Sequence, residues 1–161
     1  IHPYHIKQFN NRWFLIGLQE GDHGNYITNK ALDRIVKFSR AHVPFIPNKS
    51  IDFSEYFKDV VGVTFPDNHP EPEEVLLQFD SARFPYVVNK PIHPSQIVIN
   101  EEEHIIKLKV RPNRELEAYI FSFGHQVEVL QPLWLRTQIA EKIEDLHKKY
   151  SKMQEDCTMD L

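Results

Sequence analysis

Hydrophobic and polar residues alternate along residues 3–17 as they do in two β-strands joined by a tight turn. The turn falls at Asn10 and Asn11, whose side chains tolerate the left-handed backbone of short hairpins. Because side chains alternate across a strand, His5 and Lys7 are predicted to share one face of the first strand. Tyr4 and Ile6 are then predicted to share the other face.

The second strand is apolar on both faces, with Trp13 and Leu15 on one and Phe14 and Ile16 on the other. This pattern is typical of a strand inside a small barrel or sandwich. A glycine-containing turn at residues 19–25 leads to a predicted third strand at 26–38, which places Lys30 and Arg34 on one face. Cationic side chains from separate strands could then form a basic patch.

The pattern changes after residues 67–72, a polar run with two prolines that we interpret as a domain boundary. A connector at 43–50 and a short helix at 52–58, capped by Asp52, precede it. The elements predicted beyond it follow the order β-α-β-β-α-β and then a long helix, which is the plan of a ferredoxin-like sandwich. They are a strand at 75–79, a helix at 81–88 capped by Ser81, a hairpin at 97–99 and 105–110, a helix at 114–123, a strand at 127–130 and a helix from 132 to about 150.

The sequence therefore predicts an α+β protein with three parts. They are a first domain at residues 1–66, a second at 67–150 and a frayed tail at 151–161. The apolar positions of the last helix, from Leu135 to Leu146, suit packing on its own domain or on a partner, and internal packing is the preferred interpretation.

Composition and charge narrow the functional classes. The 161 residues are 41% hydrophobic and 26% charged, as in a soluble globular protein, and no apolar run is long enough to span a membrane. The net charge is −4, with +2 in residues 1–66 and −6 in 67–161, which argues against a nucleic-acid clamp made by the whole chain. The single cysteine, Cys157, favours a reducing, cytoplasmic setting. The abrupt start without methionine suggests a fragment that has lost an N-terminal part.

Motifs for catalysis are not found in the sequence. The nine histidines lack the spacing of zinc ligands, the five glycines form no phosphate loop, and no Gly-x-Ser-x-Gly turn occurs. We therefore predict no catalytic residue, no metal and no cofactor, and hence no enzyme activity.

Several short runs resemble the WYL-domain family of bacterial regulators. Residues 12–17 (RWFLIG) are similar to the stretch that holds the naming triplet, with Phe14 in place of its tyrosine, and residues 31–35 (ALDRI) are similar to a run that follows it. Three later runs resemble the C-terminal extension that usually follows a WYL domain: residues 91–96 (PIHPSQ), 121–124 (FSFG) and 127–136 (VEVLQPLWLR).

The resemblance implies a small SH3- or Sm-like β-barrel that senses a ligand, followed by the extension domain. It also implies an N-terminal helix-turn-helix, missing here, through which a dimeric regulator binds operator DNA. A nucleotide or a single-stranded nucleic acid is the implied ligand, held in a basic groove. The residues that the resemblance assigns to this groove are Tyr4, His5, Lys7, Arg12, Trp13, Thr28, Asn29, Lys30 and Arg34.

Cations at such a site would meet phosphates, and an aromatic ring would stack on a base. Simpler interpretations stay open. Trp13 could be a core residue, and Arg34 could pair with the neighbouring Asp33. The family's additional arginine is replaced here by the run Thr28-Asn29-Lys30. The whole chain could also be a dimerisation scaffold that binds no ligand.

Overall fold

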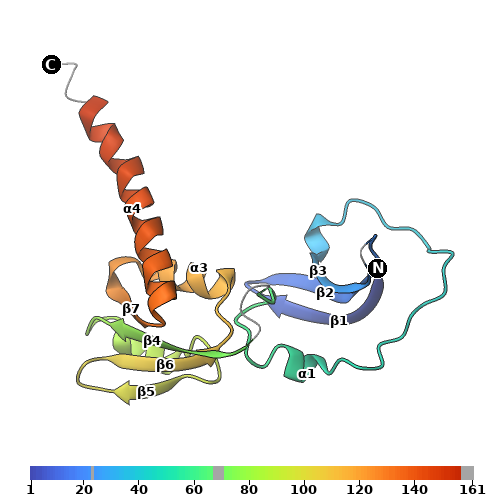
Figure 1. Ribbon diagram of the computed structural model, residues 1–161, viewed down its shortest axis with the longest axis horizontal. Coiled ribbons are helices and arrows are strands. Elements are labelled where there is room, and N and C mark those ends of the chain that lie inside the picture. The colour runs from blue at the N-terminus through green and yellow to red at the C-terminus, as the bar shows by residue number, and fades with distance from the viewer. Residues whose placement is uncertain (23, 67–70, 157–161) are drawn as a thin grey trace.

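The computed structural model describes residues 1–22, 24–66 and 71–156, and the side chains of residues 152–156 are not described. It contains two separate antiparallel sheets with helices packed beside them, so the predicted α+β class is confirmed (Figure 1). Residues 67–70 of the predicted domain boundary lie outside the described residues, as does Cys157 in the tail.

The first sheet has three strands in the order β1-β2-β3: β1 (His2–Phe9), β2 (Arg12–Gln19) and β3 (Tyr26–Ala31). The predicted hairpin turn is present, because Asn10 and Asn11 adopt φ angles of 48° and 58°. Where a barrel is expected, the described residues form an open sheet.

The third strand is shorter than predicted, because it ends at Ala31 instead of continuing to residue 38. Ala31 pairs with Phe14, and β2 begins only two residues earlier, so a longer β3 would have almost no backbone to pair with. A 3-10 turn, η1 (Leu32–Arg34), follows, and residues 35–50 contain no helix or strand. The helix predicted at 52–58 is shorter, α1 (Phe53–Tyr56), and Asp52 caps it as expected.

One face of the first sheet is covered by α1 and the chain after it. Ile16 forms a small core with Phe53, Phe57 and Val60, and Tyr4 and Phe14 pack at its margin. The predicted pairing of Tyr4 with Ile6 on one face is wrong, because a register shift between Pro3 and His5 turns the Tyr4 ring towards Phe53.

The second sheet has the order β5-β6-β4-β7 with every pair antiparallel. Its first and third strands in sequence are central, which confirms the ferredoxin-like plan. The elements are β4 (Glu73–Phe79), α2 (Phe84–Asn89), β5 (Ile97–Asn100), β6 (Ile105–Val110), α3 (Arg114–Ser122), the 3-10 turn η2 (Gly124–Gln126) and β7 (Val127–Gln131).

Two helix boundaries differ from prediction. Ser81 does not cap α2, because the carboxylate of Asp80 accepts a bond from the Arg83 N–H (2.7 Å) in a turn that delays the helix to Phe84. The last helix, α4 (Leu133–Asp156), runs into the segment predicted to be frayed. Leu135 and Ile139 of α4 are buried in the second core, whereas Ile143, Leu146 and Tyr150 are 51%, 46% and 70% exposed. The predicted internal packing therefore holds only for the first half of α4. The second half projects from the body (Figure 1).

Candidate ligand-binding surface

The residues predicted to line the groove lie on two opposite faces of the first sheet. His5 pairs with Ile16 and Lys7 with Phe14, so both point towards the covered face. The His5 ring stacks on Phe53 with centroids 5.1 Å apart, and the Lys7 Nζ lies 4.2 Å from the Phe57 centroid. Partial burial lowers the pKa of Lys7. Together with Tyr4, these side chains pack against α1.

Trp13 and Lys30 lie on the other face. Lys30 pairs with Leu15, and Trp13, two residues before Leu15, points the same way. Trp13 is 49% exposed and Ile6, on the same face, is 53% exposed. Thr28 pairs with Gly17 and so also belongs to this face. We call Trp13, Thr28 and Lys30 the open-face cluster.

Two arginines lie at the end of β2 near η1. The Arg12 Nε is 3.1 Å from a carboxylate oxygen of Asp33, so Arg12 forms the ion pair that sequence reasoning considered for Arg34. Arg34 is exposed, and no ion pair of it is found among the described residues. Of these two arginines, Arg12 is ion-paired with Asp33, whereas Arg34 has no ion-pair partner within the described part of the chain.

Asn29 has a structural contact. Its amide donates a 2.6 Å bond to the Val63 carbonyl, which ties β3 to the segment after α1. Of the nine predicted site residues, the structure thus brings Trp13, Thr28 and Lys30 together on one face and places Tyr4, His5 and Lys7 on the other.

A polar junction that sequence reasoning missed connects the two sheets. Asn113 is 6% exposed, and its amide nitrogen donates to the carbonyls of Val61 (2.8 Å) and Thr64 (2.7 Å). Its oxygen accepts from the Leu116 N–H (2.9 Å) and caps α3. An Asn before a helix is a recognisable cap signal. Its two donated bonds could not be foreseen, because they reach about fifty residues back along the chain.

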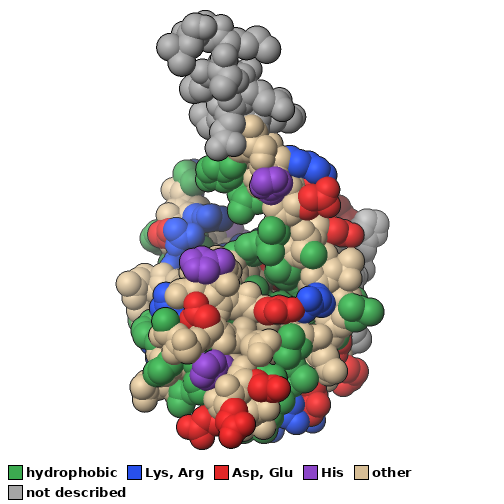
Figure 2. All heavy atoms as spheres, turned by 90° about the vertical axis from the view of Figure 1, so that its left-hand side faces the viewer, with side chains coloured by type: hydrophobic (Ala, Val, Ile, Leu, Met, Phe, Trp, Pro, Cys, Tyr) green, Lys and Arg blue, Asp and Glu red, His purple; other side chains and the backbone are tan. Residues whose placement is uncertain are grey.

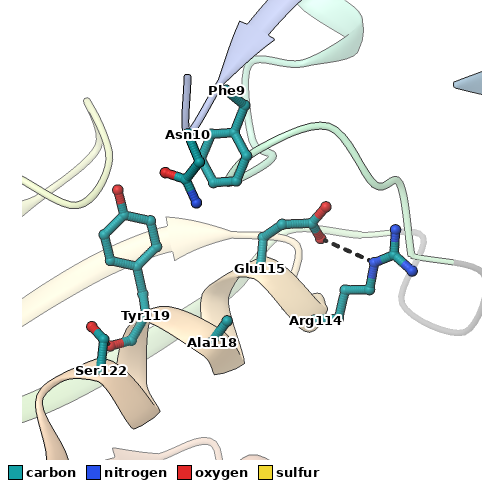
Figure 3. Close-up of a pocket in the computed structure, with 7 residues that line it drawn as sticks. All are labelled: Phe9, Asn10, Arg114, Glu115, Ala118, Tyr119 and Ser122. Carbon is teal, nitrogen blue, oxygen red and sulfur yellow. Dashed lines mark hydrogen bonds and ion pairs between the residues drawn. The ribbon is translucent and has the colours of Figure 1, made fainter. Parts of the chain in front are cut away.

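Next to this junction, a cavity of about 510 Å³ separates the β1–β2 hairpin tip from α3. Figure 3 shows Phe9 and Asn10 descending from the hairpin towards Glu115 and Tyr119 of α3. The Glu115 carboxylate accepts from the Thr64 hydroxyl (2.6 Å), so this carboxylate is engaged in the junction. Gly62, at φ 80°, allows this approach, because a Cβ there would lie 2.7 Å from the Glu115 Cγ.

His93 forms a second link between the sheets. It is 6% exposed, its Nδ1 lies 2.8 Å from the Ser95 hydroxyl, and its pKa is lowered chiefly by burial. Nearby Lys7 lowers it further, whereas the Asp59 carboxylate and a bond to the Lys58 backbone oppose the shift. His93 and Ser95 both belong to the PIHPSQ run at residues 91–96. Because His93 is buried and hydrogen-bonded, we interpret it as a structural residue.

The described residues contain no group of three His, Cys, Asp or Glu side chains placed to hold a metal ion. Among the same residues, no helix is long and apolar enough to cross a membrane.

Comparison with known proteins gives one family match, which lies after the first sheet. A search of curated proteins gives no match. Among solved structures, the chain is similar to Proteasome accessory factor B/C (PafBC) of Arthrobacter aurescens, with 16% sequence identity and a TM-score of 0.37. The similarity covers 88% of this chain and 21% of that one, so the chain spans about a fifth of the length of that protein.

The family model of the WCX domain matches residues 71–146. These residues comprise the second sheet, α2, α3 and the packed first half of α4. Residues 71–146 thus match the WCX domain, the WYL-associated C-terminal domain that the sequence resemblance implied, and we refer to them by that name below.

Proposed function

We propose that this chain is the regulatory portion of a WYL-type bacterial transcription regulator, without enzyme activity, that binds a nucleotide or a single-stranded nucleic acid. The ligand lies on the open-face cluster, with its base on Trp13 and its phosphates on Lys30 and Arg34. The WCX domain supports the regulator class, and the half-exposed indole beside Lys30 is the observation that carries the site.

The proposed mechanism needs no covalent chemistry. The regulator is a cytoplasmic homodimer that binds operator DNA through an N-terminal helix-turn-helix domain. Ligand binding shifts the population between two arrangements of the dimer, which requires that the ligand bind one arrangement more tightly than the other. The Asn113 junction supports this idea, because Asn113 of the WCX domain and Asn29 of the first sheet both bond to the segment from Val61 to Thr64.

The two faces of the first sheet give a direct test. We expect fluorescence anisotropy to detect binding of a labelled ten-nucleotide oligo-dT to the chain. Trp13→Ala should weaken it by about tenfold, because stacking contributes about 1–3 kcal/mol per base. Lys30→Ala and Arg34→Ala should weaken binding by a smaller factor, since each removes one phosphate contact.

Lys7→Ala is the matched control, because it removes one positive charge from the opposite, covered face. The affinity of the Lys7→Ala variant for the oligonucleotide should equal that of the wild type within twofold. If Lys7→Ala weakens binding as much as Lys30→Ala, the ligand is not on the open face. If no oligonucleotide or nucleotide binds at low salt, the chain is a scaffold, the alternative function that the exposed apolar residues of α4 favour.

A further inference from the structure

An edge of the WCX sheet is left unprotected. β5 is the outer strand, and its Ile97, Val98 and Ile99 are 52%, 42% and 46% exposed. An edge strand presents unpaired N–H and C=O groups, and proteins usually guard such edges with charges or proline. β5, with the sequence IVIN, contains neither.

Helix α2 extends the apolar surface beside β5. Tyr86 and Val88 of α2 are 48% and 40% exposed. A cavity of about 310 Å³ lies between the two elements, lined mainly by Phe84, Pro85, Val88 and Val98. Val98, which pairs with Ile106, therefore continues the apolar surface of α2, whereas Ile97, which pairs with Lys107, points to the other side of the same strand. We call β5 together with the exposed apolar residues of α2 the β5–α2 edge.

The β5–α2 edge has opposite charges at its two ends. The exposed Lys109 of β6 lies beside the beginning of β5, because its backbone N–H donates a 3.0 Å bond to the hydroxyl of Ser95, two residues before Ile97. Lys90 follows α2, and its Nζ lies 5.9 Å from the centre of the Tyr86 ring. At the end of β5 follow the exposed Glu101, Glu102 and Glu103. Acidic side chains also gather along the lower rim of the face seen in Figure 2, with exposed apolar side chains among them.

We propose that the β5–α2 edge is the surface by which two copies of this chain associate, with the two β5 strands antiparallel. A two-fold axis then sets the lysine end of each copy against the glutamate end of the other, whereas a parallel arrangement would set like charges together. A register shift between Val98 and Asn100 shortens the backbone pairing, so the α2 side chains supply much of the contact. The inference rests on the homodimer of the proposed function and names its interface.

Other exposed surfaces of the described residues suit a second copy less well. The apolar seam of α4, with Ile143, Leu146 and Tyr150, lies among acidic and basic side chains that already pair within the chain, such as Lys148 with Glu144 at 2.8 Å. It therefore lacks the separate positive and negative ends of the β5–α2 edge. At the other edge of the sheet, β7 carries Glu128, which pairs with Arg136 at 2.5 Å. β5 is the edge without such a charge.

The test is the mass of the 161-residue chain in solution, measured by light scattering during size-exclusion chromatography. The wild type should be a dimer, and Ile97→Lys should be a monomer, because it places two charges in the interface. Ile143→Lys is the matched control: it makes the same change at an equally exposed isoleucine of α4 and should stay dimeric.

A charge exchange keeps the test valid if Ile97→Lys fails to fold. Lys109 is exposed, so Lys109→Glu should not disturb folding, and it should raise the dimer dissociation constant at least tenfold. Adding Glu102→Lys should return the dissociation constant to the wild-type value. A monomeric wild type overturns the proposal, and so does a dimer that Ile143→Lys dissociates and Ile97→Lys does not. Oligonucleotide binding is measured separately on the Ile97→Lys monomer, so a failure of the interface and a failure of the ligand site give different results.

Discussion

At the scale of single residues, Asn113 makes the most connected polar contact between the sheets. Its amide is buried, caps α3 and donates to two carbonyls of the segment that follows α1. Removing the amide leaves Val61 and Thr64 with carbonyls that lose their partner, and the cost of such a loss is larger than the net value of the bond itself.

Asn113→Ala should therefore lower the free energy of unfolding by about 2–4 kcal/mol, from the lost cap and the unpaired carbonyls. The measurement is urea unfolding followed by circular dichroism. Asn113→Asp keeps the cap oxygen and loses the two donated bonds, so it should also destabilise the protein. A stable Asn113→Asp variant would mean that the cap alone accounts for the effect.

His93 makes stability depend on pH in a defined direction. Burial lowers its pKa below the ordinary value of 6.5, so below that value the unfolded chain binds a proton that the folded chain resists. The contribution of His93 to stability is complete above about pH 6.5 and is lost as the pH falls towards the lowered pKa. We expect the urea midpoint to fall less between pH 7.5 and pH 5.5 in His93→Gln than in the wild type. An equal fall in both proteins would contradict this origin of the pH dependence.

The alternation of residues predicted which side chains share a face of a strand, but it did not predict which face of the sheet is covered by other elements. Alternation placed His5 and Lys7 on one side of β1, and the structure agrees. Both faces of β2 are apolar, however, so alternation could not tell that α1 covers the side of Phe14 and Ile16. The covered face is the one that packs against Phe53 and Phe57, some forty residues away in sequence. This packing leaves Trp13 exposed and makes Lys7 half-buried.

At the scale of elements, the sequence predicted the order of the WCX domain well, because each element there has a strong local signal. The βαββαβ order and the hairpin between β5 and β6 are both present. The boundaries that differ depend on tertiary context. The length of β3 is limited by its partner strand, and the start of α2 is set by the turn that Asp80 makes.

Helix α4 consists of a packed half and an exposed half, and substitutions should separate them. Leu135 is fully buried, so Leu135→Ala should cost about 3 kcal/mol of stability through the cavity that it leaves. Ile143 is 51% exposed, and Ile143→Ala should cost less than about 0.5 kcal/mol. Chemical denaturation of both variants checks this contrast. A large loss in Ile143→Ala would show that the second half of α4 is covered in solution.

At the scale of the whole molecule, charge is divided between the two halves. Residues 1–66 carry a net charge of +2 and residues 67–161 carry −6, so a polyanion should contact only the first half. With two or three phosphates engaged, the slope of log K against log salt should be about −1.4 to −2.1 for a single strand. Titrations over about 50 to 200 mM salt measure it. A much steeper slope would require cations beyond the open face.

The molecule also exposes much surface for its mass. Its accessible area is 11752 Å², whereas a compact monomer of 19.1 kDa has about 8,400 Å². Residues 35–50 and the second half of α4 contribute to the excess, and Val36 and Phe38 are 100% and 90% exposed.

Residues 35–50 loop around the first sheet in Figure 1, and this layout makes them the natural point of attack for a protease. Brief trypsin digestion should cut first after Lys37 or Arg40, well before any site in the WCX domain. The strands β1 to β3 and the remainder of the chain would then be two polypeptides held together by non-covalent contacts, chiefly the packing of Ile16 against Phe53 and Phe57 and the bond from the Asn29 amide to the Val63 carbonyl. Whether the two pieces elute together from a sizing column then reports how firmly these contacts hold the first sheet to the rest of the protein.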